Sequence, residues 1–99
     1  MSTDDIVVVE RNFGLTLGDF SRIFPRIWPE FKQLSEFSAQ VVFTPTGSLE
    51  VTLSTQQYRR LASLRIPYLD ISFRFFNTSE EQRAEFFEEF ERSFQKGGG

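Results

Sequence analysis

The rest of the chain is expected to pack around residues 66–99, which read IPYLDISFRFFNTSEEQRAEFFEEFERSFQKGGG. In the first part, apolar and polar residues alternate, which is the period of a strand with one buried face. The members of that face are Leu69, Ile71, Phe73 and Phe75. In the second part, phenylalanines recur at i, i+1, i+4 and i+8, which makes one apolar stripe of a helix. The stripe consists of Phe86, Phe87, Phe90 and Phe94, and we expect it to cover the strand.

Both ends of this helix carry sequence signals. Ser79 with Gln82 has the spacing of a capping box, and Thr78 with Glu81 has the same spacing. Lys96 followed by three glycines is typical of a helix end. We therefore expect a single domain over residues 1–99, with 97–99 as a frayed C-terminal tail.

Upstream of this unit, three elements are predicted. The β-branched run that begins at Ile6 indicates a strand over 5–12, and an apolar run of this kind suggests a central strand or one covered on both faces. A helix with apolar residues at i, i+3, i+4 and i+7 starts near Leu17 and should end or kink at Pro25. Alternation on both sides of a Pro-Thr-Gly turn predicts a hairpin over 37–53.

Residues 55–63 leave two alternatives open, because Tyr58, Leu61 and Ala62 have helical spacing in a segment of barely two turns. The order is then β-α-β-β-(α)-β-α, which predicts an α+β fold with a four-stranded, mainly antiparallel sheet and helices on one face. With a helix at 55–63, the order resembles the ferredoxin-like fold with an added C-terminal helix. With a loop or an edge strand there, it resembles the saddle-shaped TBP-like folds, and both resemblances imply a two-layer sandwich.

Composition restricts the chemistry. The chain has 13 phenylalanines, which predict a core built mainly from rings, and it has neither cysteine nor histidine. Disulfides, thiolate nucleophiles and the usual neutral-pH general base are thereby removed. We therefore predict that the protein is not an enzyme. The one catalytic hypothesis that remains is a site that uses Asp70 or Glu50 with Arg74.

The charges are unevenly distributed. Residues 79–96 carry a net charge of −3, which equals the formal charge of the whole acidic chain. Glu85, Glu88 and Glu89 represent this acidic helix face, for which we predict no metal and no cofactor, since a cation cage needs ligands from elsewhere. A basic patch is formed by Arg59, Arg60 and Arg65. Nucleic acid is disfavoured as its partner, and docking against the acidic helix, within or between chains, is the alternative.

A third surface comes from the other face of the strand over 66–76. Asp70 and Arg74 lie on that face with polar residues of the predicted hairpin, and Tyr68 and Phe76 fall on it with Val42. Exposed aromatic side chains on such a face indicate an interaction surface, or else strand ends covered by loops.

Two functions follow from these features. The first is a non-catalytic interaction or adapter domain that self-associates or serves as a subunit of an assembly. The alternative is a protein that binds a small apolar or aromatic ligand in a pocket lined by Phe24, Trp28 and Phe31. No apolar run is long enough to span a membrane, and the N-terminus is acidic, so we expect a cytoplasmic protein.

Overall fold

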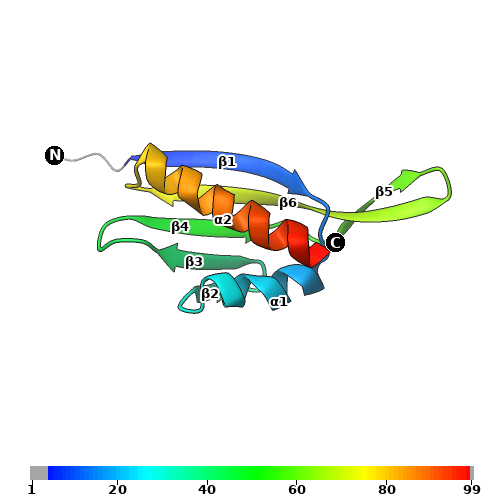
Figure 1. The fold of residues 1–99 in the computed structure, drawn as a ribbon, viewed down its shortest axis with the longest axis horizontal. Coiled ribbons are helices and arrows are strands. Elements are labelled where there is room, and N and C mark those ends of the chain that lie inside the picture. The colour runs from blue at the N-terminus through cyan, green and yellow to red at the C-terminus, as the bar shows by residue number, and fades with distance from the viewer. Residues whose placement is uncertain (1–4, 99) are drawn as a thin grey trace.

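The computed structural model of the chain describes residues 5–98, with side chains as far as Phe94. Its elements, in chain order, are β1 (Ile6–Phe13), α1 (Leu17–Ile27), β2 (Lys32–Ser35), β3 (Ser38–Val42), β4 (Ser48–Leu53), β5 (Gln57–Leu61), β6 (Leu64–Phe76) and α2 (Glu80–Gly98). The sheet runs β1-β6-β4-β3-β2, with β5 paired to β6, and every described pairing is antiparallel. Both helices cover the same face of the sheet (Figure 1). The predicted α+β class is thereby confirmed.

The core is built from rings, as predicted. Phe73, in the middle of β6, is fully buried and has its ring centroid 4.9 Å from that of Phe87 and 5.4 Å from that of Phe90. Both pairs are edge-to-face, an arrangement that aromatic quadrupoles favour. The phenylalanine stripe of α2 therefore covers the buried face of β6, and α1 adds Phe20 and Phe24 to the same cluster.

The prediction of four strands is wrong, because the sheet has six. One addition is β2, whose four residues are all exposed, so no buried alternation marks it in the sequence. The other is β5, in the segment 55–63, where the structure agrees with the loop-or-edge-strand alternative and not with the short helix. Its helical spacing is a coincidence of composition, and pairing with the N-terminal half of β6 decides its conformation. The order β-α-β-β-(α)-β-α is therefore corrected to β-α-β-β-β-β-β-α.

The position predicted for β1 is also wrong, since this strand forms an edge of the sheet. Its two faces differ: Val7 and Val9 pack against the core, whereas Ile6 and Val8 are each 51% exposed. An unbroken apolar run is compatible both with a strand covered on both faces and with an edge strand whose exposed face is also apolar.

Hydrogen-bonded caps precede both helices, in agreement with the predicted start near Leu17 and with the predicted Ser79–Gln82 capping box. Thr16 accepts a hydrogen bond from the Asp19 amide at 3.0 Å, and α1 begins at Leu17. Before α2, Ser79 and Gln82 bond reciprocally at 2.8 and 3.0 Å, which is a complete capping box. Pro25 does not end α1, because the helix continues to Ile27, and the alternative of a kink at this proline stays a prediction. Gly99, the end of the predicted tail, lies outside the described residues.

Candidate functional site

The hairpin of β5 and β6, residues 57–68, extends beyond the rest of the sheet, and we call it the arm. It projects past the ends of both helices at one end of the molecule (Figure 1). The molecule measures 55 Å along its long axis against 26 and 24 Å in the other directions. At the tip, Leu61 and Leu64 face each other across the turn and are 62% and 61% exposed.

The arm carries all three arginines of the predicted basic patch. The Arg59 guanidinium lies 4.4 Å from the ring centroid of Tyr68, and that of Arg65 lies 4.2 Å from the ring of Tyr58. Arg60 is directly opposite Arg65 in the strand register. The ion pairs found among residues 5–94 involve none of these three arginines. The patch is therefore a positive surface whose charge no described carboxylate neutralises.

The root of the arm is fixed to the sheet by polar side chains. Arg59 Nη2 donates to Asn12 Oδ1 at 3.0 Å, and Asn12 Nδ2 donates to Asp70 Oδ1 at 2.9 Å. Gln56 accepts from the Leu17 amide at 2.7 Å and donates to the carbonyl of Tyr68 at 3.1 Å. Three predicted residues, Arg59, Tyr68 and Asp70, thus lie together. Asn12 and Gln56 connect them, and no charge or pattern in the sequence singles these two out.

The predicted acidic face lies on the solvent side of α2. Glu85 and Glu88 are exposed, while Glu89 is half-buried and pairs with Arg92 at 3.3 Å. Glu91 reaches across to Arg11 of β1 at 2.8 Å. Over the described residues, no group of three or more acidic side chains is placed to hold a metal ion. The arm leads away from this face (Figure 1), and the ion pairs of the described residues join none of its arginines to a glutamate of α2.

The face of the sheet opposite the helices is uncovered, and Arg74 and Phe76 lie on it. In the strand register, Arg74 lies between Val8 of β1 and Glu50 of β4. Phe76 is half-buried at the end of β6, beside Ile6. Asp70 belongs to another row, opposite Asn12. The carboxylate of Asp70 and the guanidinium of Arg74 are thus separated along the strand.

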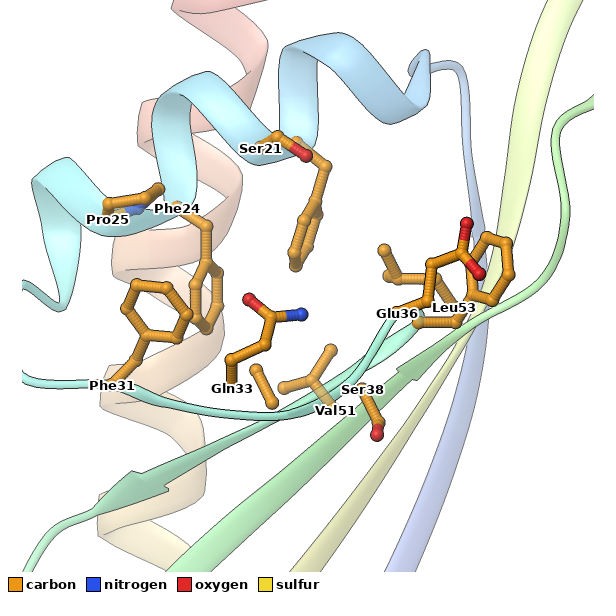
Figure 2. Close-up of a pocket in the computed structure, with 12 residues that line it drawn as sticks. Ser21, Phe24, Pro25, Phe31, Gln33, Glu36, Ser38, Val51 and Leu53 are labelled. Atoms are coloured by element: carbon orange, nitrogen blue, oxygen red, sulfur yellow. The ribbon is translucent and has the colours of Figure 1, made fainter.

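A small cavity lies between α1 and the edge of the sheet formed by β2 and β3. Its volume is about 90 Å³. Phe24 and Phe31 line it, with ring centroids 5.5 Å apart and nearly perpendicular planes. Gln33 points from β2 toward α1 beside them (Figure 2). Trp28, the third residue predicted for a pocket, lies outside this cavity and stacks on Phe86 at 4.6 Å.

Trp28 instead contributes to an open groove along the free edge of β3, which we call the edge groove. The groove has a volume of about 380 Å³. Its apolar lining includes Trp28, Val42, Phe43 and Phe86, and its acidic lining consists of Glu85 and Glu89. It exists because β2 pairs with β3 only as far as Gln40, so no described strand covers Val42 on that side.

Three comparisons, with protein-family models, with curated proteins and with solved structures, find no match for this chain. Neither described helix combines the length and the apolar character that crossing a membrane requires.

Proposed function

We propose that this chain is a non-catalytic interaction module and that the arm is the element with which it contacts another protein. The observation that carries the proposal is the pair of leucines at the arm tip, more than 60% exposed on a hairpin that leads away from both helices. A two-stranded hairpin is marginally stable by itself, so apolar side chains at its tip contribute little to folding. Their burial against a partner would contribute to binding.

The composition of the arm also supports protein recognition. Tyrosine and arginine are enriched at interface hot spots, and both stacked cation–π pairs of the arm combine the two. Stacking orders the long arginine side chains before binding, which lowers the entropy lost when a partner is engaged. The hydrogen bonds of Arg59 and Gln56 hold the root in one orientation relative to the sheet.

Site-specific photocross-linking in cells tests this proposal. A benzophenone amino acid replaces Leu64 at the arm tip, and a matched variant carries it at Thr52, which is exposed on the uncovered sheet face. We expect covalent adducts from position 64 and none from position 52. Adducts from position 52 alone, or from neither position, would contradict a recognition role for the arm.

The cavity supports a second candidate function, the binding of a small apolar molecule. Ligand pockets usually enclose about 300–1,000 Å³, and an apolar cavity of about 150 Å³ holds benzene. A cavity of about 90 Å³ is smaller than both, so this function ranks second. Pyrrole is a suitable probe, because it is smaller than benzene and its N–H can donate to the Gln33 amide that lines the cavity. A rise in thermal stability that the cavity-filling change Ala39→Val abolishes would support binding, and no rise at saturating pyrrole would contradict it.

A further inference from the structure

The arm and the edge groove lie at opposite ends of the molecule. In Figure 1 the arm projects at the right, whereas the end of β3 and the first turns of α2, which line the groove, lie at the left. With a long axis of 55 Å, the arm cannot reach the groove of its own chain. A contact between the two surfaces therefore requires a second molecule.

We propose that the partner is a second copy of this chain, and that the arm of one copy lies in the edge groove of the next, head to tail. The inference rests on the proposed function and adds the identity of the partner. The first support is the exposed apolar surface on both sides of the contact. Among the described residues, the three most exposed large hydrophobic side chains are Val42 at 65%, Leu61 at 62% and Leu64 at 61%. One belongs to the groove and two to the arm tip, so a single contact would bury all three.

The second support is charge complementarity. The arm is positive through Arg60 and Arg65, and the groove is negative through Glu85, whereas the charge of Glu89 is shared with Arg92. A neighbouring hollow that shares Trp28 and Val42 with the groove adds Glu30. Opposite potentials on two surfaces favour their association and fix its register.

The pairing of Arg60 with Arg65 strengthens this argument. Like charges directly opposite each other on neighbouring strands are destabilising, and here they occur on a hairpin with no core of its own. A carboxylate supplied by another molecule would relieve that repulsion. Glu85 is exposed at the groove, and the described ion pairs do not include it.

The third support comes from strand edges. β5 pairs with β6 on one side, and the end of β3 has no described strand beyond it on the side of the groove. Unpaired strand edges readily accept another strand by main-chain hydrogen bonds. Because arm and groove lie at opposite ends of the molecule, each copy in a head-to-tail arrangement leaves one arm or one groove free for the next copy, so the contact is heterologous and repeating it produces open chains or rings.

Complementary charge reversal tests the inference. The arm variant is Arg60→Glu with Arg65→Glu, and the groove variant is Glu30→Lys with Glu85→Lys. All four positions are exposed, so the fold is expected to persist, and circular dichroism checks it. Sedimentation velocity of the wild-type chain should show a mass that grows past two chains with concentration, and an affinity about tenfold weaker in high salt.

Each variant alone should remain monomeric, because its arm and groove then carry charge of the same sign. An equimolar mixture should assemble again, since every arm meets a groove of opposite charge. A matched control, Lys32→Glu with Arg74→Glu, changes two charges outside the arm and the groove and should assemble like the wild type.

The outcomes separate this inference from the proposed function. A wild-type chain that stays monomeric, or variants that do not assemble on mixing, would overturn the head-to-tail contact. If position 64 nevertheless cross-links to a different protein, the arm remains an interaction element with another partner. If position 64 gives no adduct at all, the proposed function fails as well.

Discussion

The two ends of β6 are both marked by a residue with an unusual backbone conformation, yet they differ in every other respect. Ala62, just before the strand, has φ 57°, and Asn77, just after it, has φ 54°. Positive φ strains an alanine, whereas asparagine tolerates it through local hydrogen bonds. The same strand thus has one end with compensating contacts and one without.

The Asn77 end joins three segments of the chain. Its amide donates to the Asp5 carbonyl at 2.8 Å, its Oδ1 accepts from the Asp5 amide at 3.1 Å, and its Nδ2 donates to the Thr46 carbonyl at 3.1 Å. Ala62 lies exposed at the tip of the arm. We infer that the Asn77 end of β6 contributes to stability, whereas the other end carries the proposed interaction element, and four predictions test this division between stability and recognition.

The largest effect is expected in the middle of β6. Phe73→Ala removes a fully buried ring from the aromatic cluster and should lower the free energy of unfolding by about 3–5 kcal/mol. Ile66→Ala, in the arm of the same strand, should cost about 1 kcal/mol or less because its surroundings are half-exposed. Urea denaturation measures both. If Phe73→Ala does not fold, Phe73→Leu is measured instead, and its free energy of unfolding should fall by about 1–2 kcal/mol.

The second prediction concerns Gly47, in the turn next to Asn77. A Cβ at this buried glycine would lie 2.8 Å from Thr44 Oγ1 and 2.9 Å from the Asn77 carbonyl oxygen, so the backbone would have to move. Gly47→Ala should therefore destabilise the fold by up to about 3 kcal/mol. Gly14→Ala is the control, since the nearest atom to its Cβ would be 4.0 Å away. Equal urea midpoints for the two variants would show that the Asn77 end is not tightly packed.

Sequence reasoning succeeded where burial and periodicity coincide. β6 and α2 were predicted with their facing residues, because a buried strand face and a phenylalanine stripe each repeat over several turns or pleats. β2 was missed because none of its residues is buried. For β5 the sequence leaves helix, loop and edge strand open, because its turn has alanine at the positive-φ position, where glycine or asparagine would have signalled a hairpin.

The candidate site was predictable only in part. The arginines of the arm and the glutamates of α2 could be recognised because charge clusters are visible in sequence. Leu61 and Leu64 are exposed because the arm extends beyond the sheet, and the edge groove is present because β2 pairs with only part of β3. Both are consequences of strand lengths, which short-range patterns do not determine.

The third prediction separates the two contributions of Asn77. Asn77→Ala removes two side-chain hydrogen bonds and leaves an alanine at positive φ, so the expected loss is about 2 kcal/mol. Asn77→Gly removes the same bonds but tolerates the conformation, and should cost about 1 kcal/mol. Equal losses would mean that the hydrogen bonds, and not the backbone conformation, account for the effect.

The smallest effect is expected at Ala62, and its sign is opposite. Ala62→Gly relieves the strain of φ 57° at the cost of a more flexible unfolded chain, for a net stabilisation of about 0.5–1 kcal/mol. Because the arm leads away from the helices, we expect the gain to appear as slower hydrogen exchange of the arm amides, with little change in the urea midpoint of the whole domain. A shift of that midpoint by the full amount would show that the arm unfolds together with the core. The two ends of β6 would then belong to one cooperative unit, and the division between stability and recognition would not hold.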